Sequence, residues 1–295
     1  MAVFVWFCTE LAHIFFLTEP LSFLQSVSIL RNKNREIETV YRFVGLADCL
    51  LSVYYLREEL PYYCLPEKAD NGYRLEGEEI YHPLIEDCVS NSVIIKEKSV
   101  LLNGSNMSGK TTFIRIIGIN VLLAQTLHTA FARTFALSTP IKIYSALMLA
   151  DDLSEGKSFY MKEVDTIKEM ISRSQEGTAN LFLFDEIFKG TNTTERIAVA
   201  KAVLSYLNTT DNIIVTSTHD AELATLLDTE YDLYHFSEVI QDETFSFDYK
   251  LKSGPLYQRN AIRLLEINGF PPTVIRDAYR TIEKISYPPT SPQPL

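Results

Sequence analysis

The stretch "VLLNGSNMSGKTT" at residues 100–112 constrains the fold of this chain more than any other. An apolar, β-type run ends at Asn103, and Gly104, Gly109 and Lys110 then follow with the spacing GxxxxGK[ST]. Glycines let backbone N–H groups curl around phosphates, and a helix that begins near Lys110 directs its positive dipole end at negative charge. The stretch therefore predicts a strand, a phosphate-binding loop and a helix in succession.

The residue types of this loop indicate a nucleoside triphosphate bound together with Mg²⁺. We expect Lys110 to reach the β- and γ-phosphates and Thr111 to offer its hydroxyl to the metal ion. The predicted nucleotide-binding residues are Asn103, Gly104, Ser105, Asn106, Met107, Ser108, Gly109, Lys110, Thr111 and Thr112.

Two adjacent carboxylates follow the apolar run in "LFLFDEIFKGTNTTER", residues 181–196. An apolar strand that ends in Asp places a carboxylate beside the phosphate loop, so we expect Asp185 to hold Mg²⁺. Because the chain turns at the end of a strand, we expect Glu186 to face the water that attacks the γ-phosphate and to act as its general base. Two acids alone would be weak evidence, but together with the loop they indicate one site.

A third strand-like run, "NIIVTSTHDAEL" at residues 212–223, ends near a histidine. At the end of a neighbouring strand, the imidazole of His219 could sense the γ-phosphate. We expect structural roles for the remaining histidines, which are His13, His82, His128 and His235.

The segment "DDLSEGKSFYMKEVDTIKEMI" at residues 151–171 predicts a helix that begins at about Ser158. Serine is a good N-cap, so Ser158 could serve only to cap this helix. Alternatively, its hydroxyl and the helix dipole could contact a phosphate carried by another subunit. The residues alone leave both interpretations open.

The chain as a whole alternates short apolar runs with helical segments after residue 75, which predicts an α/β sheet with helices on its faces. Before that point, residues 36–60 have helical periodicity. The 295 residues, 46% of them hydrophobic, can bury a substantial core. The last residues, "SYPPTSPQPL", predict an extended tail.

Charge and cysteine usage limit the function classes. A formal net charge of -11 repels phosphate backbones, so the chain by itself is not expected to bind bulk DNA. The scattered cysteines lack metal-ligand spacing and indicate reduced thiols of a cytoplasmic protein, which we expect to be buried packing residues: Cys8, Cys49, Cys64 and Cys88.

The apolar start, "MAVFVWFCTELAHIFFL", has three interpretations. It has neither the basic region nor the small-residue cleavage site of a secretory signal, and Glu10 and His13 interrupt it. A buried helix is favoured over a membrane contact. The third interpretation is an exposed apolar face at the edge of a piece of a longer protein.

The motifs and their order resemble the ATPase domain of the MutS mismatch-repair family, a branch of the ABC-type ATPases. "NGSNMSGKTT" is similar to the family's TGPNMxGKST, "DEIFKGTNTTER" to DExxxGTxTxxG, "STHDAEL" to xTHxxEL, and "GKSFYMKEV" to the signature GxSTFxxEM. The likeness extends to "YHPLIEDCVSNSVII" and to "NAIRLLEINGFPPTVIRDA", which is similar to the family's C-terminal dimerisation helices.

The resemblance implies a P-loop NTPase fold of the ABC type, with a helix-flanked sheet preceded by a small all-helical subdomain. It implies ATP hydrolysis with Mg²⁺ in a homodimer, whose Ser158 completes the opposite protomer's site and whose Asn192 lies at the dimer seam. The implied catalytic residues are Glu186, Lys110, His219 and Ser158, and the implied metal residues are Thr111 and Asp185. The implied domains are a core- or lever-like helical subdomain at 1–74, the ATPase domain at 75–254, dimerisation helices at 255–284 and the tail at 285–295.

Several residues depart from the family pattern. Phe159 and Tyr160 replace the Thr and Phe of the signature, Ser105 replaces the loop proline, and Arg196 replaces a glycine. Cys88 stands where family members often place an aromatic residue on adenine, so the base-stacking group is unassigned. Nothing in the chain resembles the family's mismatch-reading domain or DNA clamp, so DNA binding is expected only with further domains or partners.

Three functions are compatible with these features. The favoured one is an ATPase whose turnover opens and closes a dimer, with a role in DNA repair. The alternative is a nucleotide-dependent dimerisation module of a membrane-proximal or non-repair protein, which would be membrane-associated through its N-terminal or missing segments. A small-molecule kinase is disfavoured, because it would need an acceptor pocket and a lid in place of "GKSFYMKEV".

Overall fold

The chain has two compact units, Met1–Leu60 and Pro61–Leu295. They are seen in a computed structural model, which describes residues 1–15, 18–69, 74–105, 108–138, 140–147, 159–209, 211–241, 244–256 and 261–286.

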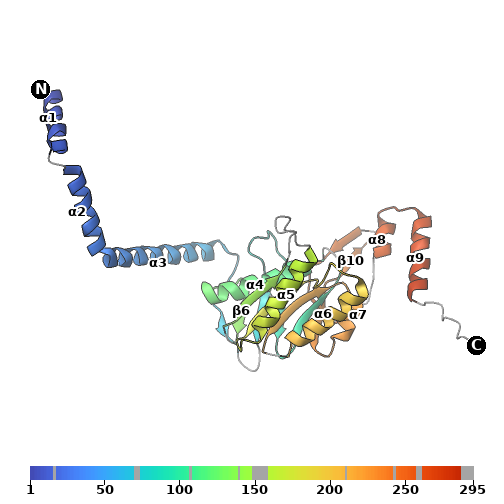
Figure 1. The fold of residues 1–295 in the computed structure, drawn as a ribbon. Helices are drawn as coiled ribbons and strands as arrows, with labels where there is room; N and C mark the ends of the chain where they lie inside the picture. The colour runs from blue at the N-terminus through green and yellow to red at the C-terminus, as the bar shows by residue number, and fades with distance from the viewer. Residues whose placement is uncertain are drawn as a thin grey trace, which may run out of the picture. The chain divides into compact units, whose positions relative to one another are not determined.

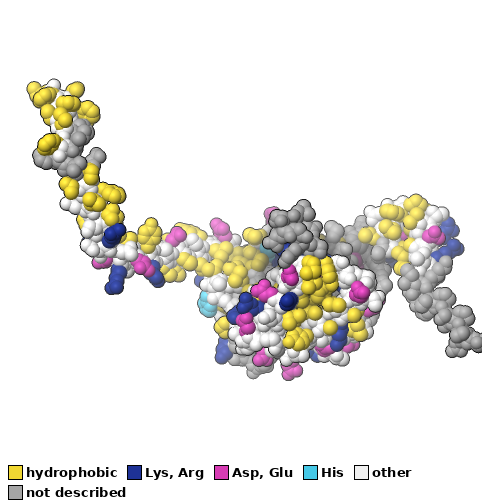
Figure 2. Space-filling view, in the orientation of Figure 1, with side chains coloured by type: hydrophobic (Ala, Val, Ile, Leu, Met, Phe, Trp, Pro, Cys, Tyr) yellow, Lys and Arg dark blue, Asp and Glu magenta, His cyan; other side chains and the backbone are white. Residues whose placement is uncertain are grey.

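The first unit consists of helices α1 (Ala2–Phe15), α2 (Thr18–Asn32) and α3 (Asn34–Glu59), so the helix predicted over residues 36–60 is confirmed. The prediction that the apolar start is buried is wrong, because Val3, Phe4 and Trp6 are 79%, 71% and 62% exposed. Within this unit, α1 contacts α2 and α2 contacts α3, and many large apolar side chains described on these helices are exposed. Figure 2 shows these side chains along the helices. None of the described helices combines the length and apolar character required to cross a membrane.

The second unit is built on a six-stranded sheet, which confirms the predicted α/β fold (Figure 1). Its strands in spatial order are β12 (Lys252–Ser253), β9 (Tyr231–His235), β4 (Ser99–Asn103), β8 (Ile213–Thr218), β7 (Asn180–Asp185) and β6 (Lys142–Ala146). The strands from β9 to β6 are parallel and β12 is antiparallel. The carboxyl ends of β4, β7 and β8 therefore meet at one edge of the sheet.

Both faces of this sheet are buried, as the nearly continuous apolar runs of its strands require. Leu181 and Leu183 of β7 face a core that includes helix α4 (Lys110–Thr126). Phe182 and Phe184 of the same strand face a second core, because successive side chains of a strand point to opposite faces. That core is completed by α5 (Phe159–Ser174), α6 (Thr193–Leu207) and α7 (Ala221–Leu226), which lie on one face of the sheet in Figure 1.

A four-stranded sheet packs against the α4 side of the first core. Its order is β1 (Glu67–Lys68), β5 (Thr134–Leu137), β2 (Leu75–Ile80) and β3 (Asn91–Ile95). Arg74 joins this sheet to the central one, since its guanidinium donates to the carbonyls of Glu97 at 2.7 Å and Asn212 at 2.6 Å.

The remaining described elements come after β9 in sequence. They are the hairpin of β10 (Glu238–Gln241) and β11 (Thr244–Phe247), then α8 (Ala261–Ile267) and α9 (Pro272–Ser286). Helix α8 contacts both α9 and β11.

The cysteines differ from their predicted buried state. Cys8 and Cys49 are exposed on α1 and α3, while Cys64 and Cys88 are partly buried against the first core. The thiols of the two helical residues lie on helices whose apolar side chains are themselves largely exposed, which accounts for the wrong prediction.

Candidate nucleotide-binding site

The phosphate loop connects β4 to α4 through two glycines in the left-handed region of backbone space. Gly104 has φ 149° and Gly109 has φ 105°, which side chains rarely tolerate. A Cβ added at Gly104 would lie 2.6 Å from the carbonyl oxygen of Phe236, so this position requires glycine for a second reason. Asn106 and Met107, predicted to bind nucleotide, lie outside the described residues.

Two loop hydroxyls, those of Ser105 and Ser108, are buried and have no hydrogen-bond partner in the described part of the chain. A buried hydroxyl without a partner is costly, so each is available to a ligand that fills the loop. Asn103, by contrast, accepts a hydrogen bond at 2.7 Å from the backbone N–H of Gly104 and so stabilises the loop itself.

Lys110 is buried and its ammonium group bends back into the loop. Its Nζ donates to the carbonyl oxygens of Gly104 at 2.8 Å and Ser105 at 2.6 Å. Burial lowers the pKa of Lys110 to about 8, although the nearby carboxylates of Glu186 and Asp185 partly oppose this shift. The first turn of α4 therefore holds a desolvated cation at the loop.

Asp185 ends β7 beneath the loop and accepts two hydroxyl hydrogen bonds. Thr111 donates to Oδ2 at 2.8 Å and Ser217 donates to Oδ1 at 2.6 Å. Asp185 and Ser217 are register partners on β7 and β8, which explains the second contact. Hydroxyl and carboxylate oxygens are the ligands that Mg²⁺ prefers. The described residues contain no group of three or more His, Cys, Asp or Glu side chains placed to hold a metal ion, so a metal ion here would rest on this mixed set of hydroxyl and carboxylate.

Glu186 follows Asp185 with φ 58°, a left-handed conformation that is unusual for a side-chain-bearing residue. The turn directs its carboxylate to His219, whose Nε2 contacts Oε1, while Lys189 lies 3.5 Å from Oε2. Burial raises the pKa of the Glu186 carboxyl, but the hydrogen bond from His219 and the charges of His219, Lys189 and Lys110 outweigh burial and lower it below its ordinary value.

His219 connects this carboxylate to the phosphate loop. Its Nδ1 lies 2.8 Å from the carbonyl oxygen of Gly104 and 3.5 Å from the Nζ of Lys110. The ring thus spans the ends of β4, β7 and β8. Two other histidines contact groups outside the loop: the Nδ1 of His82 accepts from the backbone N–H of Leu84, and the Nδ1 of His235 lies 2.8 Å from the carbonyl oxygen of Gly254.

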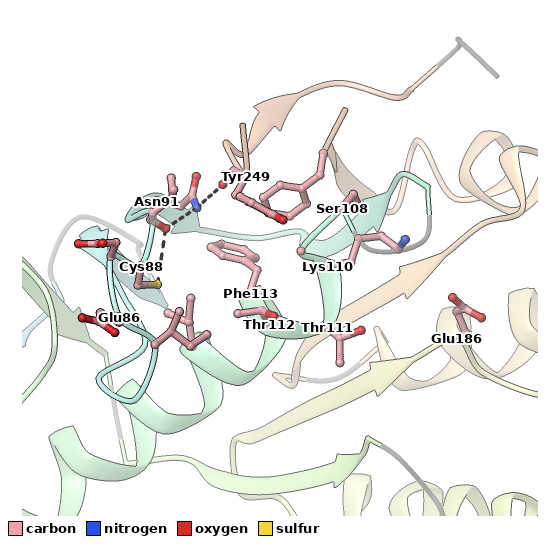
Figure 3. Close-up of a pocket in the computed structure, with 16 residues that line it drawn as sticks. Glu86, Cys88, Asn91, Ser108, Lys110, Thr111, Thr112, Phe113, Glu186 and Tyr249 are labelled. Carbon is pink, nitrogen blue, oxygen red and sulfur yellow. Dashed lines mark hydrogen bonds between the residues drawn. The ribbon is translucent and has the colours of Figure 1, made fainter. Parts of the chain in front are cut away.

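A pocket of about 540 Å³ opens beside the loop (Figure 3). Sequence reasoning left the base-stacking group unassigned, and this pocket offers an aromatic residue that it missed. A Cβ at Gly109 would lie 3.2 Å from the ring of Tyr249, so that ring lies directly over the loop. The pocket is lined by residues from segments far apart in sequence, among them Cys88, Asn91, Thr112, Phe113, Glu186, Phe236 and Tyr249.

Ser158 lies outside the described residues, and α5 begins at the next residue, Phe159. Tyr160 of α5 packs against the turn that follows Glu186, because a Cβ at Gly190 would lie 3.0 Å from the Cβ of Tyr160. Asn192 accepts a hydrogen bond from the N–H of Glu195 at 3.0 Å and so caps α6, a local role that the sequence analysis did not assign.

Comparison with known proteins decides the family. The family model described as "MutS domain V" matches residues 100–286, which is more than half of the chain. The chain belongs to the MutS domain V family. This domain is an ABC-type P-loop ATPase domain, so the predicted fold class is confirmed.

Curated relatives of the MutS family extend the similarity towards the N-terminus. The DNA mismatch repair protein MutS of Roseiflexus castenholzii is 28% identical over 283 residues, covering 91% of this chain and 25% of the relative. The proteins of that name from Listeria welshimeri and Synechococcus sp. are 26% and 29% identical, covering 90% and 76% of this chain. These alignments cover 32% and 27% of the two relatives. The chain thus spans about a quarter to a third of their length.

Proposed function

We propose that this chain binds ATP with Mg²⁺ and hydrolyses it. The observation that carries the proposal is the constellation at the three strand ends, where Thr111 and Ser217 bond Asp185 and the next residue, Glu186, turns back towards the loop. The hydroxyls of Ser105 and Ser108, which have no partner among the described residues, and the buried ammonium of Lys110 fit a phosphate chain. The described residues give no comparable support to a small-molecule kinase function.

Each residue has a proposed role. Lys110 holds negative charge at the loop, and Thr111 and Asp185 would hold Mg²⁺, which neutralises phosphate charge when bound. The carboxylate of Glu186 is ionised at neutral pH because its pKa lies below the ordinary value, so its oxygens can accept the proton of an attacking water. His219 orients that carboxylate and links it to the loop carbonyl of Gly104. Tyr249 would stack on the adenine, a role that Cys88 cannot perform because it has no aromatic ring.

The test is steady-state ATP hydrolysis by the wild type and Glu186→Gln. Removing a general base should lower kcat about 100-fold or more, while ATP binding is kept. Glu169→Gln on the exposed side of α5 is the matched control and should hydrolyse ATP like the wild type. Equal rates in all three proteins would refute the assignment of Glu186.

We further propose that two copies of the chain form a homodimer with composite sites, in which residues 255–284 act as dimerisation helices and Ser158 reaches the partner's nucleotide. The exposed apolar residues of α9, including Val274, Tyr279 and Ile282, support this proposal. The division into 1–74, 75–254, 255–284 and 285–295 is part of the same proposal.

A role in DNA mismatch repair is suggested by the names of the relatives and is proposed here for the longer protein of which this chain would be the ATPase part. Gel-shift assays with matched and mismatched duplexes, with and without ATP, test it. Because the net charge is -11, the chain alone should bind neither duplex tightly.

The alternative, a nucleotide-dependent dimerisation module near a membrane, is favoured by one observation. The large apolar residues of α1, such as Phe4 and Trp6, are more than half exposed. Sedimentation with lipid vesicles separates the two: binding that is lost when Phe4 and Trp6 are changed to Ser would favour the alternative.

A further inference from the structure

The buried carboxylate of Glu163 is not used by the proposed mechanism, yet it lies against the turn that carries Glu186. It projects from α5 and is only 4% exposed. Its Oε1 accepts a hydrogen bond from the backbone N–H of Phe188, and the N–H of Lys189 bonds the same carboxylate. Its Oε2 has no hydrogen-bond partner among the described residues. Burial raises the pKa of this carboxyl above its ordinary value, although the two N–H groups and the charge of Lys189 oppose the shift.

The turn needs such a contact because its backbone is doubly unusual. Glu186 and Phe188 have φ values of 58° and 61°, so two side-chain-bearing residues within three positions are left-handed. Conformations of this kind persist only where the surroundings hold them. Phe188 is buried, so its N–H would be unsatisfied without the Glu163 oxygen.

Helix α5 meets this turn at two points rather than one. Besides the Glu163 bond, the ring of Tyr160 lies 6.3 Å from that of Phe188, centroid to centroid, and its Cβ adjoins Gly190. Both contacts come from the first two turns of α5, within the signature-like segment "GKSFYMKEV". On the far side of the turn, Lys189 pairs with Glu186. A displacement of the start of α5 would therefore reach the Glu186 carboxylate through the backbone at Phe188 and Lys189.

We propose that Glu163 is a positioning residue that ties the start of α5 to the turn after β7 and so holds the Glu186 carboxylate in its orientation towards the phosphate loop. This inference rests on the proposed ATPase function. It gives α5 a second role besides packing, because the helix whose first turns belong to the signature-like segment fixes the general base of its own subunit.

The test uses the full chain and three variants of α5. Glu163→Leu removes the acceptor at nearly constant volume, whereas Glu163→Gln keeps an acceptor oxygen. Glu169→Leu removes an exposed carboxylate from the same helix and is the matched control.

The first readout, hydrogen–deuterium exchange of the peptide that contains residues 186–190, does not depend on hydrolysis. Loss of the bond should speed exchange at Phe188 and Lys189 at least ~10-fold in Glu163→Leu, since the buried acceptor of both N–H groups is removed. The Gln variant and the control should match the wild type. Peptides of β4 and β8 should exchange equally in all four proteins.

The second readout is the division between kcat and KM for ATP. A misplaced base should lower kcat by up to about 100-fold in Glu163→Leu with KM unchanged, and Glu163→Gln should restore most of the rate. If Glu163→Leu does not fold, Glu163→Asp, whose carboxylate is one methylene shorter, is measured in its place.

The outcomes separate this inference from the proposed function. A wild type that does not hydrolyse ATP would refute the proposed function. The exchange rates would still show whether Glu163 holds the turn after β7. Unchanged exchange in Glu163→Leu, or an equal loss of kcat in Glu169→Leu, would overturn the inference.

Discussion

At the residue scale, we expect Lys110 to make the proposed ATP binding sensitive to pH. Its pKa is lowered to about 8 by burial, so the ammonium loses its proton as the pH rises through that value. Bound phosphate favours the charged form, so above pH 8 binding must first restore the proton, and the Kd for ATP should rise about tenfold per pH unit. Calorimetric titrations at pH 7, 8 and 9 measure this slope. Lys110→Arg, which stays charged, should bind with a flat pH profile, and an equal slope in both proteins would contradict the assignment to Lys110.

The lowered pKa of Lys110 also predicts how stability changes with pH. Stability should increase as the pH rises, whereas ATP affinity should decrease. A Lys whose folded pKa lies below its unfolded value of 10.5 costs stability while both states are protonated. The folded state releases its proton first, so the free energy of unfolding contributed by Lys110 should increase between pH 8 and 10.5. Urea unfolding at pH 7.5 and 9.5, compared with Lys110→Met, isolates this contribution. It should vanish in the variant.

Arg196 stands where the MutS family usually has glycine, and in this chain it forms an ion pair with Asp220. Its Nε and Nη2 donate to both carboxylate oxygens of Asp220, at 3.0 and 2.8 Å, and both side chains are mostly buried at 24% and 14% exposure. The pair ties α6 to the residue after His219. A double-mutant cycle with Arg196→Met and Asp220→Asn should give a coupling of about 1–2 kcal/mol in urea unfolding, because the pair is bidentate and partly desolvated.

The exposed pair Arg133–Glu79 is the control for that cycle, with side chains 58% and 49% exposed. Its coupling should stay below about 1 kcal/mol. A coupling as small at Arg196–Asp220 would show that the contact has no special part in holding the His219 segment.

At the scale of secondary-structure elements, the sequence predicted what is local and missed what depends on pairing between strands. The run from β4 through Gly104 to α4 was predictable, since glycine spacing and apolar periodicity act within a few residues. The contact of Ser217 with Asp185 depends on the register of β7 and β8, and the place of Tyr249 over Gly109 depends on a return of the chain from beyond β11. No local signal encodes either one.

The exposed apolar face of helix α9 predicts how two copies of the chain associate. Its exposed apolar residues, including Val274 and Ile282, lie eight positions apart and therefore share a helix face. If this face joins two copies of the chain, Val274→Glu with Ile282→Glu should weaken self-association at least ~10-fold, since two buried apolar side chains would become charged. Sedimentation equilibrium measures it. Arg276→Glu with Arg280→Glu alters charge elsewhere on α9 and should leave the dimer intact, and dimers of equal strength in both proteins would argue against an α9 interface.

At the scale of the whole molecule, the two compact units predict where the chain can be divided. The unit that begins at Pro61 contains the phosphate loop and every described strand. Residues just after this boundary pack onto it: the ring of Tyr62 lies 4.7 Å from that of Tyr81 and 4.2 Å from the guanidinium of Arg133, and Cys64 pairs with Ala130 through backbone hydrogen bonds.

A protein of residues 61–295 should therefore bind ATP with the Kd of the full chain and unfold in urea at the same midpoint. A protein of residues 75–295 loses the Tyr62 contacts and the β1 edge strand, so its free energy of unfolding should fall by at least about 1–2 kcal/mol. The variant Tyr62→Ala in residues 61–295 serves as the intermediate case and should lose part of that difference. If 75–295 were as stable as 61–295, residues 61–74 would belong with the helices before them; if 61–295 lost ATP binding, the helices of the first unit would have to contribute to the site.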